Sequence, residues 1–267
     1  MRDYLLEIFF AGDDEELIQS RLFLTHSTGS TSTGGLISAY FDSAEDRDAA
    51  AELFAEYELH AIERERVDWL EVYQQSLEPI VIGQRFIVAP DASLFPRDSD
   101  RFTIIVPQEQ AFGTGSHETT SLCIELLESL PLEHARGLDI GAGSGILAIA
   151  MHRLGAQQVI AFDNDVDAYG ALRHNRMRNA ADVQLFIGGI EALRGGAFDV
   201  VTMNIIPEVI LPLLPQVVSR LADGARLILS GILTARSEAV IDAALAHGLE
   251  LVTASDKGEW WAGVFRR

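Results

Sequence analysis

A glycine-rich turn constrains the fold of this chain more than any other feature. The segment reads LDIGAGSGILAIA, with Gly141, Gly143 and Gly145 placed between an apolar strand pattern and an apolar helix pattern. Glycine lets the backbone of such a turn approach a ligand closely, and the first N–H groups of the helix are free to bind it. A dinucleotide-binding turn has the spacing G-x-G-x-x-G, but its third glycine would fall at Ile146. The sequence therefore predicts a ligand-binding turn that is not of the dinucleotide type.

From Phe102 onward, predicted strands alternate with predicted helices, which is typical of a parallel sheet with crossover helices. The last two strands are separated only by the short Asp256-Lys257-Gly258 turn, so they predict an antiparallel hairpin. We expect an α/β fold with a Rossmann-like, mostly parallel sheet of seven strands. The expected strands cover residues 136–140, 158–163, 183–187, 198–203, 225–230, 249–255 and 260–266.

Polar residues follow two of these strands, where an open α/β sheet binds its ligands. Asp163 ends the strand after the turn, and a carboxylate at this position can accept hydrogen bonds from two ribose hydroxyls. Asp165 is the competing candidate for that role. Asn204 follows the strand FDVVTM and is placed to orient an incoming amine, or alternatively to cap the next helix.

The G-x-G-x-G spacing, with Asp139 two residues before it, resembles the turn of class I methyltransferases that use S-adenosylmethionine. Their ligand carries a methionine ammonium and carboxylate instead of a pyrophosphate. An acidic residue near the turn suits an ammonium, whereas it would repel a pyrophosphate. Base methylation of nucleic acid is disfavoured, because the residues after Asn204 include no aromatic ring to stack on a base.

A longer block, AFGTGSHETTSLCIELLESL, resembles the ribosomal-protein methyltransferases of the PrmA type, which modify the large-subunit ribosomal protein L-eleven. The segments VVTMNI, LILSGIL and GEWW resemble the same family, and the resemblance is continuous from about Asp68 to the C-terminus. It implies S-adenosylmethionine as cofactor and methyl transfer to lysine side-chain or N-terminal amines, with Asn204 as the catalytic residue. The residues it implies for cofactor binding are Thr120, Gly141, Asp163 and Asn204. Further candidates for cofactor binding are Asp139, Gly143 and Gly145 of the turn region and Phe112, Gly113 and Thr114 of the upstream block.

His117 and Trp260 are the candidates for the substrate side of this site. For His117, local packing within its loop is the alternative. We expect no dedicated strong general base, because a sulfonium methyl is already activated and positioning provides most of the acceleration.

The first 65 residues predict a separate α+β module, which the resemblance makes a substrate-recognition domain. Tyr4–Phe10 and Leu36–Phe41 are its strand candidates, Ser27–Gly35 is expected to be a flexible loop, and Ser43 should cap a helix running to Tyr57. A linking helix is expected within Val67–Leu77. The predicted domains are residues 1–65, a connecting segment 66–100, and a methyltransferase domain 101–267.

The formal net charge of −20 disfavours direct nucleic-acid binding and suits a basic protein partner. A single cysteine, Cys123, is expected to be buried, and the histidines show no metal-ligand spacing, so no metal site is expected. With no signal or membrane-spanning pattern, we expect a cytoplasmic monomer.

Four functions remain open at this point. The main hypothesis is methylation of a ribosomal protein. The alternatives are methylation of another protein, such as the β subunit of electron-transfer flavoprotein, or of a small molecule. A protein that binds S-adenosylmethionine without catalysis is the alternative from another class.

Overall fold

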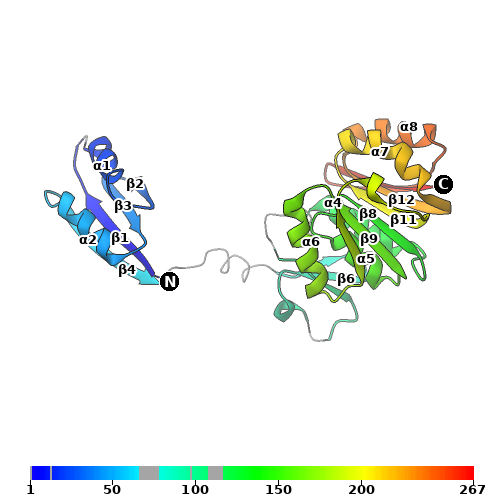
Figure 1. Ribbon diagram of the computed structural model, residues 1–267, viewed down its shortest axis with the longest axis horizontal. Helices are drawn as coiled ribbons and strands as arrows, with labels where there is room; N and C mark the ends of the chain where they lie inside the picture. The colour runs from blue at the N-terminus through cyan, green and yellow to red at the C-terminus, as the bar shows by residue number, and fades with distance from the viewer. Residues whose placement is uncertain (1, 13, 66–77, 97, 108–116) are drawn as a thin grey trace. The chain divides into compact units, whose positions relative to one another are not determined.

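The computed structural model describes residues 2–12, 14–65, 78–96, 98–107 and 117–267. The chain forms two compact units, Met1–Tyr73 and Gln74–Arg267 (Figure 1). The linking helix expected within Val67–Leu77 lies outside the described residues, and the domain boundaries at residues 65 and 100 stay predictions.

The first unit is a four-stranded antiparallel sheet with two helices. The sheet order β2-β3-β1-β4 and the chain order βαββαβ make it a split βαβ arrangement of the ferredoxin-like type. Its elements are β1 (Arg2–Phe9), α1 (Glu15–Leu22), β2 (Gly29–Thr33), β3 (Leu36–Phe41), α2 (Ala44–Leu53) and β4 (Glu58–Glu65).

Apolar side chains at alternate positions of the strands form the core of this unit. Leu6 and Ile8 of β1 pair with Ala39 and Ile37 of β3, so these four side chains share one face of the sheet. Buried residues of both helices pack against that face, among them Phe54 just after α2. The opposite positions on the strands are partly or fully exposed for the most part.

Two expectations for this unit are wrong. Ser27–Gly35 is not a flexible loop, because it contains β2, which pairs with β3 along its full length. The helix capped by Ser43 ends at Leu53 instead of continuing to Tyr57, since the chain turns there to enter β4. The cap itself is confirmed: Ser43 Oγ accepts a hydrogen bond from Asp46 N at 3.1 Å.

The second unit contains the expected seven-stranded sheet, in the order β10-β9-β8-β11-β12-β14-β13. The first four neighbouring pairs are parallel, and β14 is antiparallel to both β12 and β13, which confirms the terminal hairpin. The strands are β8 (Arg136–Ile140), β9 (Gln158–Asp163), β10 (Val183–Ile187), β11 (Phe198–Asn204), β12 (Leu221–Leu233), β13 (Glu250–Lys257) and β14 (Trp260–Arg266).

Helices cover both faces of this sheet, so the unit has three layers (Figure 1). One apolar cluster joins the sheet to α4 and α5, and a second joins its other face to α7 and α8. The helices are α4 (Glu118–Glu128), α5 (Ile146–Arg153), α6 (Val166–Arg178), α7 (Pro207–Ser219) and α8 (Ser237–Ala246). None of the helices in the described ranges is both long and apolar enough to cross a membrane.

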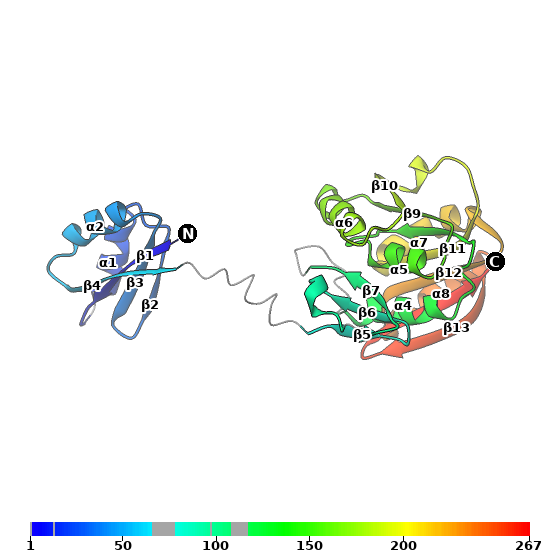
Figure 2. The same ribbon diagram turned by 90° about the horizontal axis from the view of Figure 1, so that it is seen from below.

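A small sheet of β5 (Ile80–Ile82), β6 (Phe86–Ala89) and β7 (Phe102–Ile105) lies beside α4 (Figure 2). The Glu128 carboxylate at the end of α4 accepts hydrogen bonds from the backbone N–H groups of Gln84 and Arg85, at 2.9 and 2.8 Å. Residues 78–96 therefore pack with the second unit.

Cys123 of α4 is fully buried, as expected, and its burial raises the pKa of the thiol to about 12. Its sulfur therefore behaves as a small apolar core group.

Candidate functional site

The candidate site lies where the strand order of the large sheet reverses. β8 has β9 on one side and β11 on the other, and ligands of open α/β sheets bind at such a point, beyond the carboxyl ends of the strands. The residues at these three strand ends are Gly141, Asp163 and Asn204. The topology thus brings together three residues predicted from sequence.

The glycine turn has the backbone that its sequence predicts. Gly141, Gly143 and Gly145 all have positive φ, at 68°, 52° and 80°. Side chains rarely adopt this region, so each position favours glycine. The N–H groups of Gly141 and Ala142 donate to the Phe162 carbonyl at 3.0 Å, which fixes the turn against the end of β9. Gly145 is the N-cap of α5, and this helix start lies at the carboxyl end of β8.

Asp163 is 9% exposed and holds the turn from β9. Its Oδ2 accepts from Gly143 N at 2.9 Å and its Oδ1 accepts from Asp165 N at 3.0 Å. Each carboxylate oxygen can accept a further hydrogen bond. The competing candidate, Asp165, is exposed and its carboxylate caps α6 by accepting from Asp167 N at 2.9 Å. This geometry favours Asp163 for ligand binding.

Asp139 lies beneath the turn and is 1% exposed. Its Oδ1 accepts from Thr202 Oγ1 at 2.6 Å, and its Oδ2 accepts from Ala148 N at 3.2 Å. Burial raises the pKa of this carboxyl group to about 7. Asp139 therefore links β8 to β11 and α5, and its interaction with a ligand ammonium stays a prediction.

Two buried polar atoms at the site have no hydrogen-bond partner in the described part of the chain, Thr120 Oγ1 and Asn204 Oδ1. Thr120 is fully buried near the start of α4. Such unpaired atoms are rare in folded proteins because each costs about 1–3 kcal/mol. Asn204 does not cap the next helix, since the N-cap of α7 is Ile206, without a side-chain cap bond. As far as the described residues go, both atoms can therefore accept a hydrogen bond from a ligand.

Ile205 is held between the glycine turn and an irregular position of β12 at Gly231. A Cβ at Gly141 would lie 2.6 Å from Ile205 Cγ2, and a Cβ at Gly231 would lie 2.6 Å from the Ile205 carbonyl oxygen. Ile205 N also donates to the Ser230 carbonyl at 3.1 Å. These contacts fix the backbone directly after Asn204. The sequence pattern indicated no role for Ile205 or Gly231, although a glycine at the end of a predicted strand is a signal for a bulge or a close approach of another backbone.

His117 and Trp260, both expected on the substrate side, lie together. Their ring centroids are 4.9 Å apart, with the rings edge to face at 63°. The His117 ring also accepts from Thr119 N at 3.3 Å, which makes it the N-cap of α4. Local packing of His117 is thus present, and the substrate role stays a prediction. Phe112, Gly113 and Thr114 lie outside the described residues.

Comparisons with known proteins identify the family of this chain. Residues 11–267 match the family model described as ribosomal protein L11 methyltransferase (PrmA). A relative of that name from Symbiobacterium thermophilum is 37% identical over 198 residues, which cover 74% of this chain and 65% of the relative. Another from Geobacter sulfurreducens is 41% identical over 199 residues, covering 74% and 66%. Both alignments span just under two thirds of the relative's length.

The crystal structure of a ribosomal protein L11 methylase from Lactobacillus delbrueckii subsp. bulgaricus is similar, with a TM-score of 0.66 and 28% identity. The match covers 72% of this chain and 99% of that one. The expected fold class, a Rossmann-like sheet with an antiparallel hairpin, is confirmed.

Proposed function

The chain belongs to the ribosomal protein L11 methyltransferase (PrmA) family, and on this premise we propose that it transfers methyl groups from S-adenosylmethionine to amines of that ribosomal protein. The acceptors are lysine side chains, the N-terminal amine, or both. The observation that carries the proposal is a glycine turn of the expected spacing, together with two buried atoms for which the described residues offer no hydrogen-bond partner, Thr120 Oγ1 near the start of α4 and Asn204 Oδ1 at the end of β11.

The residues present fit S-adenosylmethionine. Asp163 has acceptor capacity left for the two ribose hydroxyls. Thr120 and Asn204 supply polar groups for the methionine end, and the turn from Gly141 to Gly145 lets the backbone approach it. When bound, this cofactor supplies a methyl group that its positive sulfonium already activates.

Asn204 orients the accepting amine in this proposal. Its Oδ1 can accept a hydrogen bond from an amine N–H, which directs the nitrogen lone pair toward the methyl group. The amine must be neutral to attack, and a site with little water favours the neutral form of lysine. The new N–C bond forms as the S–C bond breaks, and the methylated amine then loses a proton to solvent. Positioning of the two reactants provides the acceleration, so no strong base is required.

The charge of the chain supports a basic protein as substrate. It carries 40 acidic and 20 basic residues, and a long-range negative field attracts a positively charged ribosomal protein. The fold of the first unit, which has its own core, supports a separate docking module. A small molecule would need no such unit.

The test is mass spectrometry of purified ribosomal protein L11 after incubation with the protein and S-adenosylmethionine. We expect mass increases of one or more methyl groups, and about a hundredfold lower turnover for Asn204→Ala at saturating cofactor, in line with loss of a group that positions a reactant. Asn164→Ala, an exposed asparagine just after β9, is the matched control and should keep full turnover.

Each alternative function has its own result in this experiment. Cofactor binding without transfer to any protein or small amine would indicate a non-catalytic module. Methyl transfer to a different protein, with none to L11, would show that this other protein is the substrate. Full turnover of Asn204→Ala would contradict only the proposed role of Asn204, and the proposed methyl transfer would stand.

A further inference from the structure

The turn after α1 displays two large apolar side chains. Phe23 is 89% exposed and its neighbour Leu24 is 82% exposed. Single exposed apolar residues are common on proteins, but two adjacent large ones with almost no cover suggest a binding surface. We name Phe23 and Leu24 the apolar anchor.

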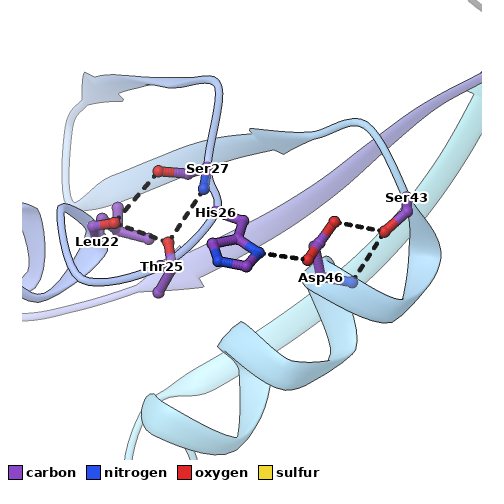
Figure 3. Close-up of polar contacts among 6 residues, drawn as sticks. All are labelled: Leu22, Thr25, His26, Ser27, Ser43 and Asp46. Carbon is purple, nitrogen blue, oxygen red and sulfur yellow. Dashed lines mark hydrogen bonds and ion pairs between the residues drawn. The ribbon is translucent and has the colours of Figure 1, made fainter.

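Hydrogen bonds hold this turn in one conformation. Thr25 Oγ1 donates to the Leu22 carbonyl at 2.7 Å and accepts from Ser27 N at 3.3 Å, while Ser27 Oγ also donates to Leu22 O at 3.3 Å (Figure 3). The backbone adds a bond from Leu24 N to the Arg21 carbonyl at 3.0 Å. The apolar anchor therefore lies on an ordered turn. Binding through an ordered turn loses less conformational entropy than binding through a mobile one.

A second set of contacts joins the turn to the start of α2. His26 Nδ1 lies 2.8 Å from Asp46 Oδ1, and Ser43 Oγ donates to Asp46 Oδ2 at 2.6 Å (Figure 3). These bonds, together with the Ser43 cap, fix the position of the turn relative to α2.

The unit around the anchor is strongly acidic. Residues 1–65 contain fifteen Asp and Glu side chains and four arginines. Each arginine is already paired with an acidic residue of the same unit, so much of the negative charge is left over. The pairs are Arg2–Glu63, Arg21–Glu56, Arg47–Asp48 and Arg64–Asp3.

The exposed apolar anchor and the excess negative charge together indicate which kind of partner the first unit can bind. An anionic membrane surface would be repelled, as would a second copy of the same acidic unit. A positively charged protein would be attracted, and an apolar pocket on it would cover Phe23 and Leu24. We propose that the apolar anchor is the site at which the first unit binds a basic protein, which is the ribosomal protein substrate if the proposed function holds.

The test compares Phe23→Ser/Leu24→Ser with wild type, using purified ribosomal protein L11 as the probe. We expect the KM for L11, and its Kd in calorimetry, to rise about tenfold or more, as for loss of a central aromatic contact. The turnover at saturating L11 and the Kd for S-adenosylhomocysteine should not change. Both residues are exposed, so the variant should fold normally, which circular dichroism would verify.

Two further variants separate the anchor from general surface effects. Val81→Ser/Leu245→Ser removes side chains that are 57% and 48% exposed in the second unit, and should leave the KM for L11 unchanged. Phe23→Leu/Leu24→Met keeps the anchor apolar and should retain most of the affinity. The wild-type KM should also rise with salt, because screening weakens the charge attraction.

The possible failures are distinguishable. If wild type methylates L11 and Phe23→Ser/Leu24→Ser keeps the wild-type KM and Kd, the anchor proposal is overturned while the proposed function stands. If wild type transfers no methyl group to L11, the proposed function fails. If sedimentation shows a wild-type dimer that the variant loses, the anchor binds a second copy and the proposal is also overturned.

Discussion

Ile205 lies directly over Gly141, so that a Cβ added at position 141 would be only 2.6 Å from Ile205 Cγ2. This contact joins the first glycine of the turn to the residue after Asn204. On the other side, the Ile205 backbone lies against Gly231, where an added Cβ would be 2.6–2.9 Å from its O, N and C atoms. The two neighbours therefore contact different parts of Ile205, one its side chain and the other its backbone.

We predict that Gly141→Ala and Gly231→Ala both destabilise the protein, but that only the first is relieved by Ile205→Ala. Removing the isoleucine side chain relieves the clash at position 141, although the strain of a positive φ remains, at about 1–2 kcal/mol. It leaves the backbone contact at position 231 unchanged. Urea unfolding of the single and double variants should give a coupling energy of about 1 kcal/mol or more for 141 with 205. Equal coupling for 231 with 205 would contradict this geometry.

Substitutions at Asp163 and at Asp165 should have different effects. The first should weaken cofactor binding, and the second should lower stability. Asp163→Asn removes the charge beside the glycine turn, and we expect the Kd for S-adenosylhomocysteine to rise about tenfold or more, as for loss of a charged hydrogen bond. Asp165→Ala removes the cap of α6 and should cost about 1 kcal/mol of stability with the Kd unchanged. Calorimetry and thermal unfolding check both. If only Asp165→Ala raised the Kd for S-adenosylhomocysteine, Asp165 would be the residue that binds the cofactor.

Trp260 should affect the protein substrate more than the cofactor. It is partly exposed at the start of β14, next to His117 and the start of α4. An aromatic face at this edge can pack on the methylene groups of a lysine and attract its cationic form. We expect Trp260→Ala to raise the KM for L11 about tenfold, with little change in the Kd for S-adenosylhomocysteine, while Trp260→Phe stays near wild type. An equal loss of cofactor affinity would indicate that the ring supports the cofactor site instead.

The central strands of the large sheet could be predicted because β8, β9, β11 and β14 are mostly buried apolar runs bounded by turns and helices. The strand β2 could not be predicted, since GSTST at the edge of the small unit is mostly exposed and adopts its conformation by pairing with β3. The same holds for β4, whose sequence ELHAIERE is rich in charge and pairs along β1.

The residues of the candidate site were predictable where a motif fixes the backbone, as at Gly141 and Asp163. The position of Ile205 between the glycine turn and Gly231 of β12 depends on three neighbouring strands, and no local pattern encodes it. The contact between His117 and Trp260 joins residues far apart in the sequence. That Asn204 Oδ1 has no partner among the described residues depends on which residue caps α7. These features arise from tertiary packing.

The buried carboxyl group of Asp139 should make stability depend on pH. Burial raises its pKa from the ordinary 3.8 to about 7, so between these values the folded protein binds a proton that the unfolded chain has released. Stability is therefore lost as pH rises from about 4 to about 7, and the ionised form remains unfavourable above that range. The ionised carboxylate accepts from both Thr202 Oγ1 and Ala148 N. On protonation at Oδ1 the bond to Thr202 reverses, so that the carboxyl O–H donates to Thr202 Oγ1 while Oδ2 still accepts from Ala148 N.

Asp139→Asn should remove this dependence, because an amide copies the neutral acid: its NH₂ donates to Thr202 and its oxygen accepts from Ala148. We expect urea unfolding at pH 4 to give similar stabilities for wild type and Asp139→Asn, and at pH 8 to give the variant the higher stability. Asp242→Asn, at an exposed position, should follow wild type at both values. A variant less stable than wild type at pH 8 would show that the ionised carboxylate is the favoured form in the fold. If Asp139→Asn also weakens binding of S-adenosylhomocysteine more at pH 8 than at pH 5, the carboxylate attracts the ligand ammonium despite its burial, because only its ionised form carries the charge to do so.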